Sequence, residues 1–400
     1  MSLRVDPGPI AKKIRIPGSK SYANRYLVLA ARYGAGAVVE NLPHADDVTL
    51  LVQALQAVGI KLKPTKAGWE FLNSFPECES SEGPLDINVG EGGTTGRFLL
   101  ALLSTGKRTY RLHLAGRLSE RPWSELIEAL KSASVKVKLQ DNIIEVQGPA
   151  DRTRLPKTVS AARSTQFLSA LQLAFYHDNV LFDGSQITAS LPYWKMTVAS
   201  YEQLEFNSIM TVPLDWSSAA YPICYAAVTG EVITLPGLRP DLHQADSALY
   251  ELLKQRGAIR STGGLIRQAG LEVRGLSDKR PIKMDLRHCP DLTPALAFLC
   301  AHLEGESVLE GLEALVHKES DRLLAIRDLL QSVGVKVTAT ASSLIIKGGL
   351  SLGPWKLVTP PDHRLVMTAA LFLRAHQGGT LEHPECVQKS FPGFFSAMGF

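Results

Sequence analysis

A lysine, two serines and an arginine follow a Pro-Gly turn near the start of the chain, in the stretch IPGSKSYANR at residues 16–25. Basic and hydroxyl side chains beside a glycine turn are typical ligands of phosphate. The nucleotide P-loop requires G-x-x-x-x-G-K-[ST], and no glycine directly precedes Lys20. The stretch therefore argues against a nucleotide site, and it is compatible with another anion site or with a solvated turn that enters a helix.

A second candidate is the glycine-rich segment VGEGGTTGRF at residues 89–98, which is followed by the basic segment 117–122. Glycines let a backbone approach a ligand closely, and Arg97 follows them by about one helical turn. A dinucleotide fingerprint is excluded, because Thr95 stands where G-x-G-x-x-G requires its last glycine. A loop capped by Thr94 explains the same residues as well as a binding site does.

Two further segments combine polar or charged residues with apolar runs. Ser164, Thr165 and Gln166 precede the apolar run of ARSTQFLSALQ, where such residues typically cap a helix. The segment HKESDRLLAIRDLL at 317–330 places its charges within about one and a half helical turns, and Asp291 follows Pro290 upstream. Ion pairs on a helix surface would account for these charges without any site.

The last cluster lies in PPDHRLVMTAALFL, where Asp362, His363 and Arg364 stand at the mouth of an apolar helix, and Lys389 follows in QKSFPGFF. A single histidine in that place is more often a cap or a structural partner than a catalyst. The metal-binding spacing H-E-x-x-H is absent, so no metal site is predicted.

The elements that would present these clusters recur along the chain as a leucine-rich helix, a glycine or small residue, and a strand. Leucines at i, i+3, i+4 and i+7 predict amphipathic helices, and VKV and LIIKG alternate as strands do. Glycine after the helix suits a C-cap. Six positions mark the copies: Gly59, Ser134, Glu205, Gly257, Gly334 and Gly399. We interpret the pattern as six β/α units, three in each of two lobes, although any α/β chain offers some such segments.

The starts of the repeated helices indicate what the lobes could bind. Helix N-termini present free N–H groups and a partial positive charge to anions. If all units share one orientation, six helix starts face one cleft suited to negatively charged substrates. The expected starts are Asp46-Asp47, Arg121-Pro122, Pro192-Tyr193, Asp246, Asp321-Arg322 and Ser390-Phe391-Pro392.

The bulk composition limits the class of protein. Four hundred residues with 45% hydrophobic and 20% charged side chains indicate an ordinary globular chain of one large or two smaller domains. A net charge of +4 without a Lys/Arg run predicts no nucleic-acid partner. Five scattered cysteines favour reduced thiols in the cytoplasm. Charges in the first twenty residues exclude a signal-peptide core, and short apolar runs predict no membrane partner.

In combination, the motifs PGSKSxxNR, STQF, KESDR, DHR and KSFP resemble the 5-enolpyruvylshikimate-3-phosphate synthase family of enolpyruvyl transferases, from about Pro17 to Phe395. The resemblance implies an α/β (α+β) fold, a two-lobed inside-out α/β barrel with three βαβαββ repeats around inner helices in each lobe. The implied lobes are 1–16 with 213–400, which carries the acid–base residues, and 17–212, which carries most acceptor contacts.

The resemblance also implies a reaction, the transfer of the enolpyruvyl group of phosphoenolpyruvate to the 5-hydroxyl of shikimate 3-phosphate, without a metal or organic cofactor. The positions that match phosphoenolpyruvate contacts are Lys20, Gly93, Thr94, Arg121, Gln166, Arg322, Arg364 and Lys389. The positions that match shikimate 3-phosphate contacts are Lys20, Ser21, Arg25, Ser164, Thr165, Gln166, Ser190, Tyr193, Asp291 and Lys318. The matching catalytic set is Lys20, Asp291, Glu319 and His363.

This chemistry explains the residue types. Two phosphorylated substrates repel each other, so lysines and arginines must neutralise them in a cleft between the lobes. Asp291 is expected to take the proton of the attacking hydroxyl, with Lys20 and Glu319 as proton carriers in an addition–elimination. Closure of the lobes would expel water and strengthen the charge contacts.

Several positions depart from the family pattern. Residues 91–94 read EGGT in place of N-[SA]-G-T, and a carboxylate there should repel an anion unless Glu91 turns away or pairs with an arginine. Val316 stands where Lys or Arg is usual, Ala314 where some members have Asn, and Phe98 replaces a common proline. We therefore expect a divergent member that binds the phosphoenolpyruvate mimic glyphosate differently.

Two alternatives remain. The sister enzyme that uses UDP-N-acetylglucosamine shares the fold and phosphoenolpyruvate, but it typically bears a loop cysteine, and none lies between Cys78 and Cys224. Where the sister enzyme typically has Arg or Lys followed by Asn near its start, this chain has Lys20 followed by Ser21. The other alternative is a non-catalytic anion-binding paralogue whose site Glu91 has spoiled. For the main interpretation and for both alternatives, we expect a monomer in the cytoplasm.

Overall fold

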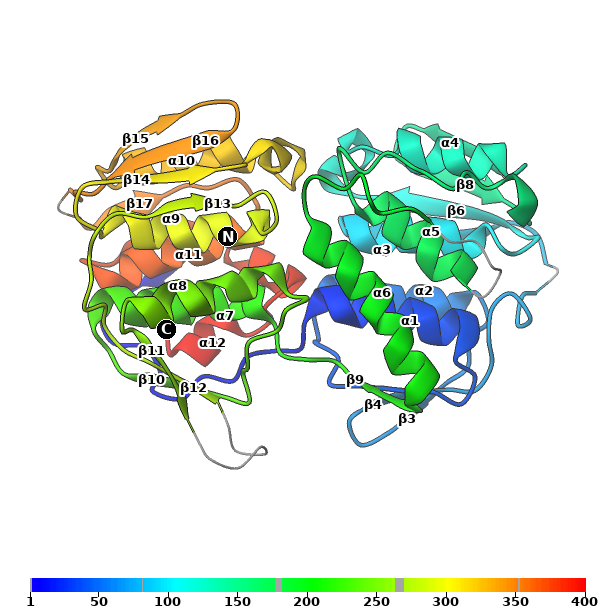
Figure 1. The fold of residues 1–400 in the computed structure, drawn as a ribbon, viewed down its shortest axis with the longest axis horizontal. Coiled ribbons are helices and arrows are strands. Elements are labelled where there is room, and N and C mark those ends of the chain that lie inside the picture. The colour runs from blue at the N-terminus through cyan, green and yellow to red at the C-terminus, as the bar shows by residue number, and fades with distance from the viewer. Residues whose placement is uncertain (1, 81, 177–181, 263–269, 352) are drawn as a thin grey trace. The chain divides into compact units, whose positions relative to one another are not determined.

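The structure is a computed structural model that describes residues 2–80, 82–176, 182–262, 270–351 and 353–400 (Figure 1). The chain divides into two compact units, one of residues 1–17 and 214–400 and one of residues 18–213. We call them the terminal unit and the central unit. Each limit lies one residue from the boundary expected from the sequence.

The central unit is built around three inner helices that pack against one another, α1 (Lys20–Tyr33), α3 (Gly93–Leu103) and α5 (Gln166–Phe175). These helices are buried nearly all round, because runs such as FLLALL in α3 leave no polar face for water. The outer helices are α2 (Asp46–Ala57), α4 (Ser124–Ser132) and α6 (Leu191–Phe206), and the short 3₁₀ helices are η1 (Gly116–Glu120) and η2 (Arg152–Arg154).

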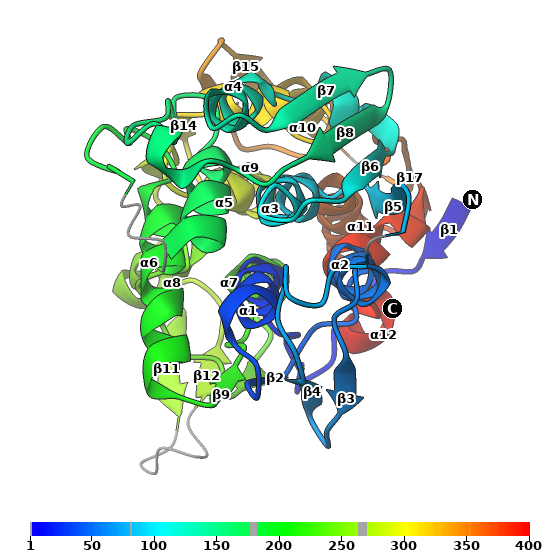
Figure 2. The same cartoon turned by 90° about the vertical axis from the view of Figure 1, so that its right-hand side faces the viewer.

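Two four-stranded sheets cover these helices, as Figure 2 shows. One sheet has the order β3-β4-β2-β9, with β2 (Val38–Glu40), β3 (Leu62–Pro64), β4 (Gly68–Phe71) and β9 (Ile209–Thr211). The other has the order β5-β6-β8-β7, with β5 (Leu85–Gly90), β6 (Thr109–Leu114), β7 (Lys136–Gln140) and β8 (Ile143–Gln147).

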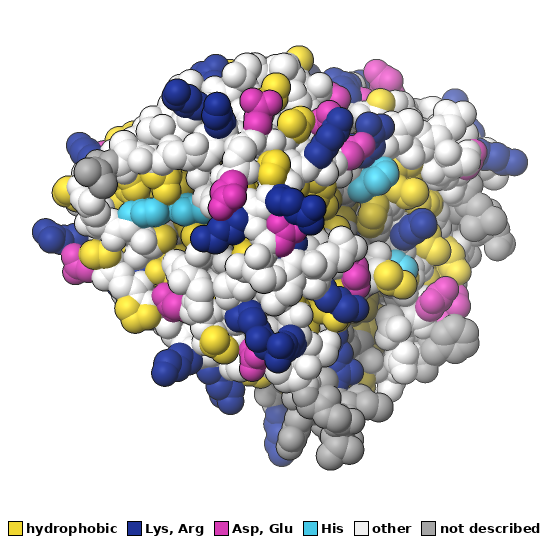
Figure 3. All heavy atoms as spheres, turned by 60° about the vertical axis from the view of Figure 1, so that its left-hand side comes forward, with side chains coloured by type: hydrophobic (Ala, Val, Ile, Leu, Met, Phe, Trp, Pro, Cys, Tyr) yellow, Lys and Arg dark blue, Asp and Glu magenta, His cyan; other side chains and the backbone are white. Residues whose placement is uncertain are grey.

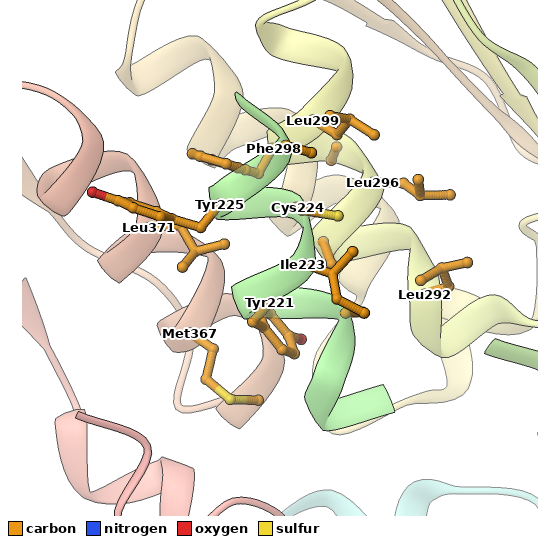
Figure 4. Close-up of a cluster of buried hydrophobic side chains, with 14 of the residues drawn as sticks. Tyr221, Ile223, Cys224, Tyr225, Leu292, Leu296, Phe298, Leu299, Met367 and Leu371 are labelled. Carbon is orange, nitrogen blue, oxygen red and sulfur yellow. The ribbon is translucent and has the colours of Figure 1, made fainter. Parts of the chain in front are cut away.

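The terminal unit repeats this plan with inner helices α7 (Trp216–Thr229), α9 (Thr293–Ala301) and α11 (His363–Ala375). Figure 4 shows their buried contact, in which Ile223 and Tyr225 of α7 lie with Phe298 of α9 and Leu371 of α11. The outer helices are α8 (Ala248–Gln255), α10 (Arg322–Ser332) and α12 (Phe394–Met398). Short 3₁₀ helices precede the outer ones or follow strands: η4 (Ala245–Ser247), η5 (Pro290–Leu292), η6 (Glu313–His317) and η7 (Pro384–Lys389).

Three sheets surround the inner helices of the terminal unit. The first is β1-β18-β17, with β1 (Ser2–Val5), β17 (Trp355–Leu357) and β18 (Gly379–Glu382). The second is β10-β12-β11, with β10 (Ile233–Pro236), β11 (Ile259–Thr262) and β12 (Gly270–Val273). The third is β13-β14-β16-β15, with β13 (Lys283–Asp285), β14 (Glu306–Glu310), β15 (Lys336–Ala339) and β16 (Ser343–Lys347).

The expected βαβαββ repeat is complete once in each unit, as β5-α3-β6-α4-β7-β8 and as β13-α9-β14-α10-β15-β16. In both copies the first two strands are parallel and the last two form an antiparallel hairpin. Elsewhere a distant segment supplies a strand, since β9 pairs with β2 and Lys13 bridges Thr234. Part of the third expected repeat of the central unit falls on 177–181, outside the described residues.

The predicted turns after the repeated helices are confirmed at five of the six marked positions. Left-handed backbone occurs at Gly59, Gly257, Gly334 and Gly399, with φ between 71° and 105°, and at Ser134 with φ 67°. The sixth prediction was wrong, because Glu205 lies inside α6 and the helix ends in extended backbone. The six outer helices begin at the expected segments or within two residues of them.

None of the helices in the described ranges has the length and apolar character needed to cross a membrane. On the face that Figure 3 draws, basic and acidic side chains are interspersed, in line with the small net charge of the chain.

Candidate active site

In the terminal unit, Asp291 lies among three cations. Its Oδ1 accepts hydrogen bonds from Lys318 Nζ at 3.1 Å and Arg322 Nη1 at 2.8 Å, and its Oδ2 accepts one from Arg364 Nη2 at 3.1 Å. Burial by itself would raise the pKa of Asp291, but the charges of Arg364, Lys318 and Arg322 hold it well below the usual range. Asp291 is therefore ionised, and the three cations around it determine whether a substrate could reach its carboxylate.

Arg322 links Asp291 to two further carboxylates. Its Nε donates to Asp362 Oδ2 at 2.7 Å, and its Nη2 donates to Glu319 Oε2 at 2.6 Å. Lys389 Nζ lies 3.4 Å from Glu319 Oε1 and extends the network to η7. Burial opposes the charge of Arg322, but Asp362 and Glu319 raise its pKa above the usual value. The guanidinium is thus permanently charged and fixed in position.

The starts of two helices hold this cluster together. Asp362 is the N-cap of α11 and accepts from Arg364 N at 3.0 Å, while the same carboxylate holds Arg322 and accepts from Ser320 Oγ at 3.1 Å. His363 follows the cap, and its Nδ1 lies 3.7 Å from Asp362 Oδ1 in a fully buried position. One carboxylate therefore caps a helix and orients an arginine at once.

The alternative of surface ion pairs accounts for only part of the charge at 317–330, because Arg327 and Asp328 pair with side chains 35% and 61% exposed, whereas Arg322 is buried. The side chains of Arg322 and Asp362 are 1% and 0% exposed. The apolar face of α10 packs on the core and carries Arg322, the first residue of the helix, inward with it.

In the central unit, Lys20 is the first residue of α1, directly after the crossover from the terminal unit. Its Nζ donates to Asp47 Oδ2 at 2.7 Å. Asp47 opens α2 and is itself fixed, because its carbonyl accepts from Thr95 Oγ1 at 3.0 Å. A Cβ added at Gly92 would lie 2.9 Å from Asp47 Oδ1. The opening stretch and the glycine-rich segment therefore meet at Asp47.

Two guanidinium groups converge on Gly93 at the start of α3. A Cβ added at Gly93 would lie 2.9 Å from Arg97 Nη1 and 3.0 Å from Arg121 Nη1. Arg97 is held by its Nη2 bond to Pro122 O at 2.8 Å and by the ring of Trp123, 5.1 Å from its Cζ. A side chain at this position would have to displace the guanidinium ends of these two arginines.

Gln166 joins this group from the start of α5. Its Nε2 donates to Thr94 Oγ1 at 3.0 Å, and its Oε1 accepts from Arg97 Nη1 at 2.5 Å. Its backbone N donates to Ser164 Oγ at 3.2 Å, so local capping and a longer-range contact coexist. Thr94 does not cap the glycine loop, because Gly92 is the N-cap and makes no side-chain bond.

A third group in the central unit is organised by Arg25. Its Nε donates to Thr197 Oγ1 at 2.9 Å, its Nη1 to Ser21 O at 2.8 Å and its Nη2 to Tyr193 O at 2.9 Å. Burial lowers the pKa of Arg25 to about 10. Tyr193 N donates to Ser190 O at 3.1 Å, and Ser190 takes left-handed backbone with φ 57° before α6.

Two positions complete the account of the residues named from the sequence. Thr165 is buried, and its carbonyl accepts from Ser169 N at 3.0 Å within α5. Glu91, the departure from the family loop, turns its carboxyl toward η1, where a Cβ added at Gly116 would lie 2.6 Å from Glu91 Oε1.

The residues named from the sequence thus fall into groups within each unit, and three residues outside the implied contact and catalytic sets support them. Asp47 holds Lys20, Arg97 holds Gln166, and Asp362 holds Arg322. Asp47 and Asp362 carried a signal, since each stands at a predicted helix start, and Arg97 closes the glycine-rich motif. In the described ranges, no group of three or more His, Cys, Asp or Glu side chains could hold a metal ion.

A family model described as EPSP synthase (3-phosphoshikimate 1-carboxyvinyltransferase) matches residues 5–207 and 184–398. Curated proteins named 3-phosphoshikimate 1-carboxyvinyltransferase from Syntrophobacter fumaroxidans and Pyrococcus abyssi are 32% and 30% identical to the chain. The alignments cover 97% and 98% of this chain and 96% and 95% of those proteins. The match therefore spans both units.

Solved structures give the same fold. An EPSP synthase from Acinetobacter baumannii has a TM-score of 0.75 at 23% identity, covering 99% of this chain and 97% of its own. The enolpyruvyl transferase NikO from Streptomyces tendae has a TM-score of 0.74 at 16% identity, covering 100% and 96%. At these identities the likeness shows the fold alone, and both structures support the two-lobed α/β architecture.

Proposed function

This chain belongs to the EPSP synthase family, and we propose that it transfers the enolpyruvyl group of phosphoenolpyruvate to the 5-hydroxyl of shikimate 3-phosphate, with release of phosphate. The observation that carries the proposal is the setting of Asp291, an ionised carboxylate held by Lys318, Arg322 and Arg364. Such a group offers a proton acceptor and anion ligands in one place, which the reaction between two phosphorylated substrates requires.

We assign the anion-binding role by the chemistry of the cations. Arginine binds carboxylate and phosphate through paired N–H groups, and lysine supplies a compact charge. Phosphoenolpyruvate would take Lys20, Arg121 and the Gly93 turn from the central unit, and Arg364 and Lys389 from the terminal unit. Thr94, Gln166 and Arg322 would complete its contacts.

The acceptor, shikimate 3-phosphate, would be bound by the hydroxyl and charged side chains that match the family's acceptor contacts. Ser164 and Thr165 precede α5, where helix N–H groups favour phosphate, and Ser190 precedes α6. Arg25 would support the site by holding the backbone at Ser21 and Tyr193. The others in this set are Lys20, Gln166, Asp291 and Lys318.

Substrate binding would prepare the carboxylates for proton transfer. In the structure, cations hold the pKa of Asp291 well below its usual range, which makes it a weak base. Anionic substrates would share Arg322 and Arg364 with Asp291, and would share Lys389 with Glu319. The pKa of Asp291 would then rise toward the value that favours general acid–base catalysis.

The proposed reaction then runs in two steps. A proton carrier, Lys20 or Glu319, protonates the methylene carbon of phosphoenolpyruvate, and the 5-hydroxyl oxygen bonds to C2 as Asp291 takes its proton. In the second step, the bond between C2 and the phosphate oxygen breaks, the departing phosphate takes up the proton held by Asp291, and a methyl proton returns to the carrier. The products are the enolpyruvyl ether and inorganic phosphate, so no redox partner or cofactor is required. His363, the site histidine implied by the family resemblance, is buried beside Asp362 and would support the site from that position.

The test is a steady-state assay that measures phosphate release with phosphoenolpyruvate and shikimate 3-phosphate, together with mass spectrometry of the product. We expect release only when both substrates are present. Turnover with UDP-N-acetylglucosamine in place of shikimate 3-phosphate would favour the sister activity. Binding of both substrates without turnover would favour a non-catalytic paralogue.

We further propose that the protein acts as a monomer in the cytoplasm. All five cysteines are free thiols, with Cys224, Cys289 and Cys300 buried, and reduced thiols are usual in that compartment. The carboxyl of Glu91 turns toward Gly116, which supports the proposal that the loop at 91–94 tolerates this carboxylate. We also propose that this loop binds glyphosate differently from the N-[SA]-G-T loop of other family members.

A further inference from the structure

A further carboxyl group lies in the terminal unit outside the ion pairs around Asp291. Asp246 stands in η4 and is 1% exposed. Its Oδ2 accepts a short hydrogen bond from Ser217 Oγ in the first turn of α7. Its Oδ1 is buried and has no hydrogen-bond partner in the part of the chain that the structure describes. A buried carboxylate with this little support is costly, so the site favours the neutral acid.

The position of Asp246 is fixed by the packing of η4 on α7. Trp216 N donates to Gln244 Oε1 at 2.9 Å, and Gln244 Nε2 donates to Leu214 O at 2.8 Å and to Asp241 Oδ2 at 3.0 Å. These bonds hold η4 against the start of α7, where the carboxyl of Asp246 is buried.

Asp246 on η4 and Asp291 on η5 belong to segments that both pack against α7, and the ionisable groups whose charges act on Asp246 come from these elements and from α11. They are Asp215 at the N-cap of α7, Cys289 and Asp291 at η5, and Arg364 on α11. Burial and then the charge of Asp291 raise the pKa of Asp246 to about 7, against the opposing charge of Arg364. Asp246 thus changes its charge in the range where the enzyme would work.

We propose that Asp246 is a positioning residue for the transfer reaction and acts through Asp291, because its negative charge opposes the cations that hold the Asp291 carboxylate. The inference rests on the proposed function, since it concerns how strongly Asp291 accepts the hydroxyl proton. It adds a residue that lies outside the substrate contacts named above.

The physical basis is that the interaction between two titrating groups is reciprocal. If the charge of Asp291 raises the pKa of Asp246, the charge of Asp246 raises that of Asp291 by the same energy. With Asp246 neutral, Lys318, Arg322 and Arg364 keep Asp291 a weak base. When Asp246 is ionised, its negative charge makes Asp291 a stronger base. The rate of hydroxyl deprotonation should therefore increase as Asp246 loses its proton.

The test compares kcat of the unmodified protein and of Asp246→Asn between pH 5.5 and 9, with both substrates saturating. The amide has the shape of the neutral acid, so the two proteins should have similar kcat at pH 6. Their ratio should rise with a midpoint near pH 7 and reach several-fold at pH 8.5, at most about tenfold, which corresponds to one pKa unit. Ionisation of the substrates affects both proteins and cancels in the ratio.

The matched control is Ser217→Ala, which removes the hydroxyl whose bond lowers the pKa of Asp246. In this variant the midpoint of the ratio should move to higher pH. Adding Ser217→Ala to Asp246→Asn should not restore a pH-dependent ratio. A kcat ratio that is constant with pH, as a purely structural role would give, overturns the inference and leaves the proposed function standing. Absence of turnover in the unmodified protein overturns both.

Thermal unfolding gives a readout that is independent of activity. The folded-state pKa of Asp246 is raised to about 7, so the folded protein binds this proton more tightly than the unfolded chain does. Its contribution to stability is full below about pH 4 and is lost as the pH rises to 7. The Tm of the unmodified protein relative to Asp246→Asn should fall over this window, and a constant difference would contradict the inference.

Discussion

Each unit buries an arginine, but the two arginines have opposite surroundings. Arg322 in the terminal unit contacts three carboxylates, whereas Arg25 in the central unit donates to three neutral oxygens. Burial lowers the pKa of Arg25 to about 10, while the carboxylates raise that of Arg322 despite burial. The same side chain is therefore part of a charge-balanced network in one unit and a desolvated cation in the other.

The difference indicates a division of work between the units. The terminal cluster sets four cations against three carboxylates, and such a group can hand a cation to a substrate and gain a base in exchange. In the central unit, Arg25 and Arg97 are oriented by carbonyl, hydroxyl and amide groups, which fix a guanidinium without cancelling its charge. The terminal cluster suits proton transfer together with anion binding, and the central unit suits anion binding, with Lys20 as its proposed proton carrier.

The largest effect is expected at Lys20, where the central unit contributes to the chemistry itself. Lys20→Met removes a proton carrier and an anion ligand, so kcat should fall by roughly 10²–10⁴-fold. The side chains of Lys20 and Asp47 are only 18% and 5% exposed, so loss of the lysine also leaves a buried carboxylate without its partner, and the Tm should fall as well. Kinetics and thermal unfolding of one preparation measure both. Near-normal turnover would remove the central unit from the proposed proton transfer.

The comparison of the buried arginines is tested by Arg322→Gln against Arg25→Gln. Arg322→Gln leaves carboxylates buried without their partner, and such losses cost about 3–5 kcal/mol. Arg25→Gln breaks bonds to neutral oxygens, which cost about 1–3 kcal/mol when left unmade. Thermal or denaturant unfolding would rank the two variants. Equal losses, or a larger loss at Arg25, would contradict the distinction between a charge-balanced network and neutral support.

The anion-binding role of the central unit is tested by Gly93→Ala. The added Cβ would displace the guanidinium groups of Arg97 and Arg121, so the KM for phosphoenolpyruvate should rise by about tenfold, which is about 1.4 kcal/mol. Gly83→Ala in the same unit is the matched control, because nothing lies within 4 Å of its added Cβ. An unchanged KM in Gly93→Ala would mean that these arginines do not bind this substrate.

The smallest effect concerns the acid limb of stability in the terminal unit. The folded-state pKa of Asp291 lies well below its unfolded value, so its stabilisation is present above about pH 4 and is lost as the pH falls through the lower value. The Tm difference between the unmodified protein and Asp291→Asn should therefore shrink below pH 4. A difference that grows on acidification would contradict the ion-pair account of Asp291.

The repeating fold was predictable because its signals are local. The leucine spacing and the glycines at Gly59, Gly257 and Gly334 fix helix, turn and strand within about twenty residues. Ser134 shows that the same left-handed turn forms without glycine when the surrounding helix and hairpin require it. Glu205 was misjudged because α6 ends without such a turn.

The sequence predicted which residues belong to the charged clusters, but it did not predict which residues pair with one another. The sequence shows Glu319 and Arg322 as neighbours on one helix turn, but it cannot show that Asp362, 40 residues away, is the buried partner of Arg322. The contact of Arg97 with Gln166 joins residues 69 apart. Such pairs depend on which helix faces the core, and only the packed structure determines that.

The central claim is that basic residues of both units bind phosphoenolpyruvate. The most direct measurement is kcat/KM for phosphoenolpyruvate in Arg121→Gln, from the central unit, and in Lys389→Gln, from the terminal unit. Loss of a charge-assisted hydrogen bond costs about 1.5–3 kcal/mol, so each variant should lose roughly 10- to 150-fold. If either variant retains the kcat/KM of the unmodified protein, that residue does not bind phosphoenolpyruvate and the central claim is contradicted.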